Sequence, residues 1–272
     1  MFIENFDFLS KDEVLSLIEE KGVVRISIDE KPKNTENFKH LAVVLKEKKD
    51  VQLVIYGRDE NWVKLEYFKD LVDIEHIEFH LITSPRLDNI DGISNFKSLR
   101  TIEFHYIYKR SIDLTELLQC NQLKNIVFEE KLTKKQHLTL EKMENLEYAK
   151  LKGLDASLFS NPFINITELV LYSVQNMETF EVIFPNIKRI TIYDSNKVKS
   201  IDFLIKLKKL EFLNIIGMNS VVQIPDLSNL EKLDSLSYMN MKRVENKILY
   251  NESRTKIRIA KVANNSTLNY HA

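Results

Sequence analysis

A six-residue phrase of the form L-x-x-L-x-I recurs along almost the whole chain and constrains its fold more than any other feature. The clearest copy carries Leu210, Leu213 and Ile215 at positions one, four and six. Successive copies begin 20 to 28 residues apart, too regularly for chance even in a chain that is 44% hydrophobic. The copies begin at Val23, Val51, Ile74, Leu99, Leu123, Leu146, Ile166, Ile187, Leu210 and Leu233, with a weak eleventh read as Ile257, Ala260 and Val262.

The phrase predicts one short β-strand in each copy. Positions four and six are apolar and alternate with polar positions, which is typical of a half-buried strand. Such a strand is too short to bury its own apolar face, so it must stack beside the strands of neighbouring copies. We therefore expect an α/β protein with a parallel sheet, in which the segments between strands return the chain along the other side.

The phrase and its period resemble those of leucine-rich repeat proteins, in particular the short, irregular, intracellular bacterial-type repeats, over about residues 23–240. The returns at 90–99, 201–210 and 224–230 support the resemblance, because they repeat an apolar x-x-F-L-x-x-L-x-x-L-like pattern. The resemblance implies a curved solenoid with the sheet on the concave face and helices, 3-10 turns and irregular returns on the convex face. It also implies an Asn shortly after each strand. Asn196 and Asn219 match that pattern, whereas Ile82, Lys131 and Leu154 depart from it.

The segments outside the array predict caps. Ser10 and Glu13 form a capping-box pattern, followed by apolar residues through Ile18 and a helix stop at Gly22. We interpret residues 1–22 as an N-terminal helical cap, 23–240 as the array of about ten repeats, and 241–272 as a C-terminal cap or weak last repeat and tail. Within the array, helices are expected at 35–49 and 60–71, with further helix starts near Asp113 and Thr133, and thinner returns in the middle repeats.

Composition narrows the functional classes. The chain has 39 basic and 40 acidic residues, so overall charge favours neither nucleic acid nor an anionic membrane. No apolar run reaches the roughly 18 residues of a membrane span, and the acidic start lacks the basic region of a secretory signal. Cys120 is the single cysteine, so an internal disulfide is excluded and a cytoplasmic location is expected. No phosphate-binding glycine loop, G-x-S-x-G or H-E-x-x-H pattern occurs, so we expect no enzymatic activity and no cofactor.

Two clusters of functional residue types fall on the predicted concave face. The first contains His76, Glu78, His80, Glu103, His105 and Glu129. Adjacent strands should place Glu78 beside Glu103 and His80 beside His105, so that the two carboxylates repel each other unless a cation lies over them. Histidine and carboxylate groups together also suit a divalent metal. A metal-dependent hydrolase is therefore one alternative function, although a solvated face needs no metal.

The second cluster joins aromatic and basic residues of the types enriched in binding hot spots. Its members are Tyr148, Lys150, Lys152, Tyr172, Arg189, Tyr193 and Phe212. The resemblance implies a non-enzymatic scaffold that recognises another protein on its concave face, with an inhibitor or a toxin-neutralising immunity protein as one such role. The whole second cluster is predicted to contribute to this binding, together with Glu78, His80, Glu103 and His105 of the first.

The C-terminal end offers a further alternative. Seven bases stand there against two acids, which could meet nucleic acid or an acidic partner. These bases are Lys242, Arg243, Lys247, Arg254, Lys256, Arg258 and Lys261. A solvated C-terminal cap is the favoured explanation, so nucleic-acid binding remains the less favoured prediction.

Overall fold

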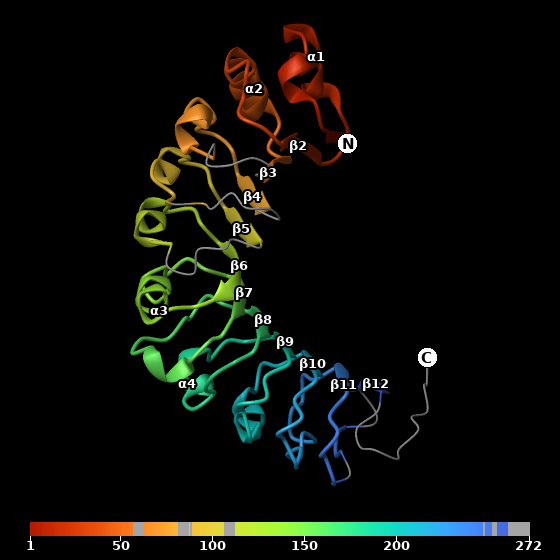
Figure 1. Cartoon of the computed structure of the whole chain (residues 1–272). Coiled ribbons are helices and arrows are strands. Elements are labelled where there is room, and N and C mark those ends of the chain that lie inside the picture. The colour runs from red at the N-terminus through yellow and green to blue at the C-terminus, as the bar shows by residue number, and fades with distance from the viewer. Residues whose placement is uncertain are drawn as a thin grey trace. The chain divides into compact units, whose positions relative to one another are not determined.

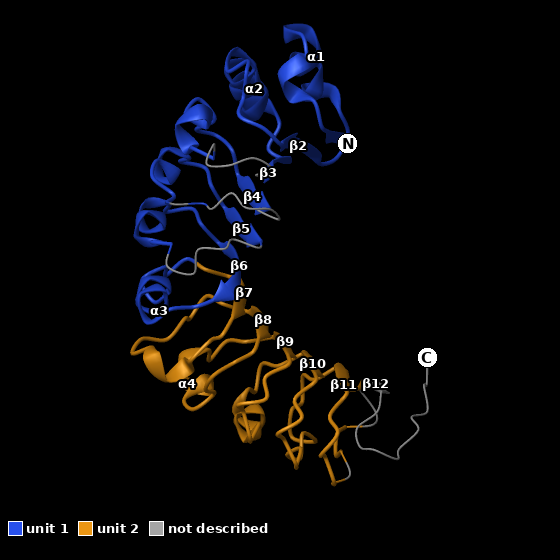
Figure 2. Cartoon of the chain, viewed as in Figure 1, with its two compact units in different colours: residues 1–145 blue, residues 146–272 orange. Residues whose placement is uncertain are grey.

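The computed structural model describes residues 1–56, 63–80, 87, 89–105, 112–246, 248–251 and 255–260, with the backbone alone for 257–260. The chain divides into two compact units, residues 1–145 and 146–272 (Figure 2). Each unit is a stack of parallel strands with its helical returns on the side of the core (Figure 1). Among the described residues, no helix combines the length and apolarity needed to cross a membrane.

Unit 1 alternates strands with returns that contain helices. Every strand pairs in parallel with its neighbour in chain order. The strands are β1 (Phe2–Ile3), β2 (Val24–Ile28), β3 (Val51–Tyr56), β4 (His76–His80), β5 (Thr101–His105) and β6 (Asn125–Lys131). The helices are η1 (Phe6–Phe8), α1 (Lys11–Ser16), η2 (Leu17–Glu19), α2 (Glu36–Glu47), η3 (Leu65–Phe68), η4 (Ile93–Asn95), η5 (Thr115–Gln119) and α3 (Lys134–Leu140), where η denotes a 3-10 helix.

Unit 2 has the same parallel pairing and thinner returns. Its strands are β7 (Tyr148–Lys152), β8 (Glu168–Tyr172), β9 (Arg189–Tyr193), β10 (Phe212–Ile216), β11 (Ser235–Met239) and β12 (Lys256–Ala260). Its helices are η6 (Ala156–Leu158), α4 (Phe180–Ile183) and η7 (Asp202–Lys206). Copies that begin only 20 or 21 residues apart leave room for a single turn between strands, which is why these returns are thin.

Positions four and six of the repeats form the core of each unit. In unit 1, the rings of Phe79 and Phe104, both at position six, stack with centroids 5.4 Å apart. In unit 2, Leu213 and Ile215 are fully buried in β10. The alternation that the phrase predicted is therefore the alternation between the core and the opposite face of the sheet.

The register of β3 corrects the reading of the second copy. Leu53 and Ile55 stand opposite Ile77 and Phe79, the fourth and sixth residues of the next copy. The copy therefore begins one residue earlier than predicted, and Val54, not Ile55, belongs to the face opposite the core. Residues 53–55 are all apolar and buried, so their sequence gives no alternation from which the register could be derived.

The last copy also begins earlier than predicted. Ile257 is the partner of Leu236, and Ile259 is the partner of Tyr238. Ile257 therefore occupies position four rather than position one, and the copy begins three residues earlier, at residue 254. Because position one of this copy is the polar Arg254, the L-x-x-L-x-I pattern cannot be recognised there from the sequence.

The helical predictions are confirmed where a capping pattern or a long apolar face specified them. Ser10 and Thr133 each accept a hydrogen bond from the backbone three residues on, in complete capping boxes that begin α1 and α3. The helix expected at 35–49 is α2. Ile18, predicted to pack, is instead exposed, because α1 ends at Ser16 and the chain tightens into η2.

Two of the predicted helices are shorter than expected. The helix predicted at 60–71 is only the 3-10 turn η3 among its described residues, and Trp62 lies outside them. Leu65 and Phe68 are nevertheless buried, as the spacing predicted. The start near Asp113 leads to the 3-10 helix η5 rather than to an α-helix.

The N-terminal segment contributes a strand as well as a helix. β1 pairs with β2 through Phe2 and Ile3, so the sheet of unit 1 extends into the region predicted to be a helical cap. Asn37 of α2 holds this segment against the array, because its Nδ2 donates to the carbonyl oxygens of Phe6 and Leu9 at 2.9 and 3.0 Å.

Candidate functional site

Positions three, five and seven of the repeats form one face of each sheet, which we call the outer sheet face. Along β7, β8 and β10 these positions are half-buried, whereas positions four and six are buried. In-register pairing places equal positions of neighbouring strands side by side. Each side chain on this face therefore lies beside the side chain at the same position of the next repeat.

Row seven of unit 2 brings two tyrosines together. Tyr172 and Tyr193 are paired residues on β8 and β9, and their rings stack with centroids 4.6 Å apart and planes 9° apart. The row begins with Lys152 and continues with Ile216 and Met239. Two stacked rings and two apolar side chains thus form a continuous, half-exposed row.

A feature of the backbone that the sequence analysis missed holds this row in place. The residue after position seven has a positive φ in each of the repeats β7 to β11, namely at Gly153, Ser173, Asp194, Gly217 and Asn240. In this conformation the amide of Ser173 donates to the carbonyl of Tyr193 at 3.1 Å, and that of Gly153 donates to Tyr172 at 2.7 Å. The signal was present as a Gly or a short polar residue directly after each of these five strands.

The basic side chains of the second cluster lie against its rings. The Lys150 ammonium lies 5.6 Å from the ring centre of Tyr172, and the Arg189 guanidinium lies 4.4 Å from that of Phe212. Both distances suit cation–π attraction. We call this set the aromatic–basic patch: Tyr148, Lys150, Lys152, Tyr172, Arg189, Tyr193 and Phe212.

One acid lies within the patch. Glu168 is the partner of both Tyr148 and Arg189 in the sheet, and its Oε2 lies 3.5 Å from Arg189 Nε. Because Arg189 is exposed, this ion pair contributes little to stability. Its effect is to orient the guanidinium over Phe212.

In unit 1 the six residues of the first cluster also come together, and we call them the Glu–His cluster. His76 Nε2 lies 3.3 Å from Glu78 Oε1 and 3.1 Å from Glu103 Oε1. His105 joins two strands, since its Nε2 contacts Glu103 at 2.9 Å and its Nδ1 contacts Glu129 at 3.1 Å. His80 Nε2 lies 3.0 Å from Glu78 Oε2.

Arg25 belongs to this cluster, although the sequence analysis did not include it. Its Nη2 lies 2.7 Å from Glu78 Oε2. Arg25 is on β2 and Glu78 on β4, so the arginine reaches across β3, and the pattern of adjacent positions gave no signal for this contact. Glu78 and Glu103 lie side by side, as expected. Each carboxylate has cationic partners, so repulsion between the two does not dominate.

The imidazoles of row seven stack in unit 1. His80 and His105 are paired residues whose ring centres are 4.4 Å apart, with planes 21° apart. Tyr56 extends the stack, at 5.1 Å from His80. Tyr56 is the true position seven of the second copy, whereas the predicted residue, Gly57, lies outside the described residues.

The ion pairs of the Glu–His cluster shift its titrations. Burial alone would lower the pKa of His76 and His105, but the glutamates beside them outweigh it and raise the pKa values to about 8 and about 9. Burial opposes ionisation of Glu103, yet His105 and His76 lower its pKa to about 2. Burial also opposes ionisation of Glu78, yet His76, His80 and Arg25 hold the pKa of Glu78 well below its usual range. At neutral pH, two imidazolium groups and one guanidinium therefore face the carboxylates.

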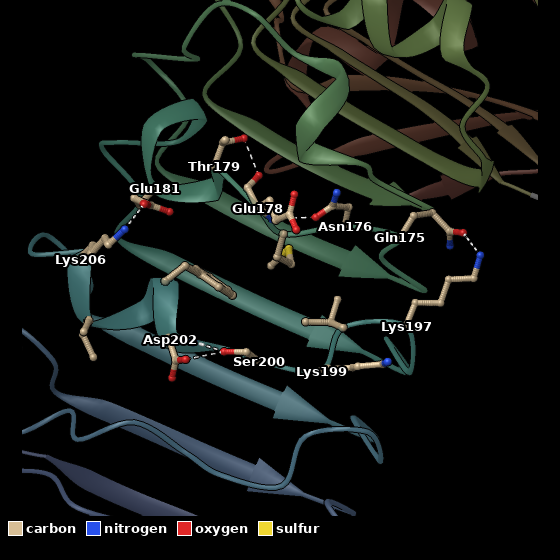
Figure 3. Close-up of a pocket in the computed structure, with 14 residues that line it drawn as sticks. Gln175, Asn176, Glu178, Thr179, Glu181, Lys197, Lys199, Ser200, Asp202 and Lys206 are labelled. Atoms are coloured by element: carbon tan, nitrogen blue, oxygen red, sulfur yellow. Dashed lines mark hydrogen bonds and ion pairs between the residues drawn. The ribbon is translucent and has the colours of Figure 1, made fainter.

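A separate pocket lies among the returns of unit 2. It has a volume of about 560 Å³ and is lined by residues 175–181 and 197–206, which follow β8 and β9 (Figure 3). Lys206 pairs with Glu181, and Lys197 Nζ donates to Gln175 Oε1 at 2.6 Å. Its charged side chains of both signs largely neutralise one another, and its lining residues include neither histidine nor cysteine.

The remaining predicted sites are placed apart from these clusters. Lys242, Arg243 and Lys256 are exposed, whereas Lys247, Arg254 and Lys261 lie outside the described residues, as does the side chain of Arg258. Cys120 is buried, and burial raises the pKa of its thiol to about 11, so it is a poor nucleophile.

Comparison with known proteins gives structural likeness without a sequence match. No protein-family model matches the chain, and no curated protein matches it. An internalin C2 from Listeria monocytogenes is 18% identical, with a TM-score of 0.48 over 76% of this chain and 84% of that one. The functional domain of InlJ from Listeria monocytogenes is 13% identical, with a TM-score of 0.37 over 92% and 70%. The leucine-rich repeat domain of the type III effector XopL is 12% identical, with a TM-score of 0.44 over 95% and 92%.

The repeats themselves identify the fold. The ten repeats with strands β2 to β11 each place positions four and six on a parallel strand and bury both, and short helices or turns connect the strands. Asn196 and Asn219 connect neighbouring repeats, since Asn196 Oδ1 accepts from the amide of Asn219 at 2.8 Å and Asn219 Oδ1 accepts from that of Lys242 at 3.4 Å, although these hydrogen bonds lie at the surface and not in a buried ladder. Both units of this chain are built of leucine-rich repeats.

Proposed function

We propose that this protein is a non-enzymatic binding module that recognises another protein through the aromatic–basic patch of unit 2. The observation that carries the proposal is the stacked, half-exposed pair Tyr172 and Tyr193, with Lys150 against one ring. Tyrosine and arginine are enriched among residues that dominate binding energy. Strands and the hydrogen bonds that follow them hold these side chains in place, which reduces the ordering cost of association.

The ring faces favour a protein over a single-stranded nucleic acid. Base recognition on a sheet requires an open aromatic face on which a base can stack. Tyr172 has Tyr193 on one side and Lys150 on the other, because β7 and β9 flank β8. Arg189 lies over the ring of Phe212. Both faces of Tyr172, one face of Tyr193 and one face of Phe212 are therefore already occupied.

The chemistry of the patch defines the partner's surface. The row from Tyr172 to Met239 suits an apolar side chain, and Lys150, Lys152 and Arg189 suit carboxylates around it. We therefore infer a partner with an apolar anchor inside an acidic rim. Inhibition of an enzyme or neutralisation of a toxin is the use of such a face that the repeat family implies.

The test is a double substitution, Tyr172→Ala with Tyr193→Ala. A partner is first captured from native lysate with the wild-type chain, identified and purified. Calorimetric titration should then show binding weakened by at least about 2 kcal/mol, roughly 30-fold, because both rings of the central pair are removed. Melting curves should change little, since both rings lie on the outer sheet face.

Tyr67→Ala provides the matched control. Tyr67 is a half-buried tyrosine in the η3 return of unit 1, away from the outer sheet face, and it also contacts a lysine. Its removal should leave affinity unchanged. Wild-type affinity in a folded Tyr172→Ala/Tyr193→Ala variant would show that the patch is not the binding site.

A further inference from the structure

We propose that His76, Glu78 and Glu103 form a binding site for a divalent transition metal, with zinc as the best-suited ion. The three side chains come from β4 and β5, and one donor atom from each lies within 4.8 Å of the others. This site belongs to unit 1 and is independent of the protein-binding patch of unit 2.

The separations of the donor atoms suit one ion. His76 Nε2 is 3.1 Å from Glu103 Oε1 and 3.3 Å from Glu78 Oε1. Zinc binds nitrogen and oxygen at about 2.0–2.1 Å in a tetrahedral arrangement, which places two ligand atoms roughly 3.3 Å apart. The same side chains therefore need little movement to become ligands.

Outer contacts select which oxygen of each carboxylate faces His76. Arg25 and His80 hold Oε2 of Glu78, at 2.7 and 3.0 Å. His105 holds Oε2 of Glu103 at 2.9 Å. Both Oε1 atoms are thereby directed to the same ring nitrogen. Hydrogen-bonded outer residues that orient carboxylate ligands are a regular part of protein metal sites.

The ring nitrogen of His76 gives an independent indication. Nε2 is shielded from solvent, yet among the described residues it has no hydrogen bond of good geometry, although two carboxylate oxygens lie within 3.3 Å. Its contacts with the two oxygens are therefore close in distance but do not have the angles of a hydrogen bond. A zinc ion that replaces the proton on His76 Nε2 would contact all three atoms, and the proton would be released to solvent.

A second possible triplet, Glu78 with His80 and His105, has the wrong ring geometry. The two imidazoles stack with planes only 21° apart and centres 4.4 Å apart. Because the nitrogen lone pairs lie in the ring planes, those of stacked rings run side by side and do not converge on one ion. His80 and His105 therefore act as outer partners of Glu78 and Glu103.

The donor set indicates the class of ion. One imidazole and two carboxylates suit zinc or manganese better than calcium or magnesium, which prefer oxygen ligands alone. Three protein ligands leave a fourth position for water. His76 and Glu103 are about one-fifth exposed, so the site lies close to the protein surface.

The experiment uses the full chain, treated with EDTA and dialysed. Calorimetric titration with zinc chloride should give one ion per chain, and cobalt chloride should give the visible absorption of a four-coordinate Co²⁺ ion with a nitrogen ligand. His76→Asn and, separately, Glu103→Gln should weaken zinc binding by more than about 100-fold, whereas loss of the outer contact in His80→Gln should cost about 10- to 100-fold. Glu103→Gln keeps the shape of the side chain, which guards against loss of folding.

His40→Asn is the matched control, because His40 is a half-buried histidine of α2 outside the cluster. It should bind zinc as the wild type does. Absence of a one-to-one site in the wild type would overturn the proposal. So would unchanged binding in a folded His76→Asn variant, or a loss in His80→Gln as large as that in His76→Asn.

Discussion

At the scale of single residues, Tyr238 departs from the rule that the core positions follow. It occupies position six of β11, where other repeats carry Phe, Ile or Leu, and its side chain is fully buried. Its hydroxyl has no hydrogen-bond partner among the described residues, and burial raises the pKa of Tyr238 far above its usual range. A buried hydroxyl without a partner costs about 1–3 kcal/mol.

We therefore expect Tyr238→Phe to stabilise the protein. Removing the hydroxyl eliminates its desolvation cost and keeps the ring, so the free energy of unfolding should rise by about 1 kcal/mol and the melting temperature by about 2–4 °C. Urea unfolding and thermal melting monitored by circular dichroism measure both. Tyr67→Phe, at a half-exposed ring, should leave them unchanged, and a less stable Tyr238→Phe protein would mean that the hydroxyl is hydrogen-bonded in solution.

At the scale of elements, a strand cannot unfold without destabilising the strands on either side of it. β10 pairs with β9 and β11, and Leu213 lies between Ile190 and Leu236 at position four of all three. These side chains are fully buried. A short strand in a stack has no other apolar surface against which to pack, so damage at position four spreads to both adjacent strands.

Leu213→Asp should unfold this part of unit 2. A carboxylate buried among aliphatic side chains has no cationic partner, so the expected destabilisation exceeds about 3 kcal/mol. Hydrogen exchange should show lost protection in β9, β10 and β11 together with a lower melting temperature. Lys208→Asp, an equal introduction of acid at an exposed residue just before β10, is the control. A Leu213→Asp melting curve within a degree or two of wild type would contradict the core assignment.

At the scale of the whole molecule, basic and acidic residues are nearly equal in number but are unevenly distributed over the structure. The 39 basic and 40 acidic residues nearly cancel, whereas the Glu–His cluster concentrates coupled charges on one sheet face. Five side chains from four strands face His76 and His105 or their carboxylate partners. They are Arg25 on β2, Glu78 and His80 on β4, Glu103 on β5 and Glu129 on β6, while Tyr56 of β3 stacks on His80.

The cluster predicts how stability depends on pH. The pKa values of His76 and His105 rise from 6.5 to about 8 and about 9 on folding, so their stabilisation is complete below pH 6.5 and is lost as pH rises to about 9. The pKa of Glu103 falls from 4.5 to about 2, so its stabilisation is present above pH 4.5 and is lost as pH falls towards 2. We expect greatest stability between these limits.

Melting curves of EDTA-treated protein at a series of pH values test this prediction. The melting temperature should fall by about 5 °C between pH 6.5 and 9. His105→Gln should be less stable at pH 6.5 and should show a smaller alkaline decline, because Gln does not titrate. An equal decline in wild type and variant would assign the effect to other groups.

Local patterns in the sequence determined the repeat, the core and several helices. The phrase repeats because every copy must bury the same two positions, so Leu213 and Ile215 could be identified without knowledge of their neighbours. The capping boxes at Ser10 and Thr133 and the apolar face of α2 are likewise complete within one turn or one helix, and they formed as predicted. The residues of the aromatic–basic patch, and those of the Glu–His cluster apart from Arg25, followed from the period, since equal positions of adjacent copies must lie side by side.

Only the tertiary structure decided the geometry that gives these clusters their chemistry. Arg25 reaches Glu78 across an intervening strand, and the stacking of Tyr172 on Tyr193 depends on rotamers held by neighbours about 20 residues away in the chain. The register of β3 was also decided in this way, because three consecutive apolar residues fit either face until their neighbours β2 and β4 are in place. The physical reason is the same in each case: burial preference is a property of one residue, whereas ion pairs, ring stacking and strand register are properties of pairs that only folding brings together.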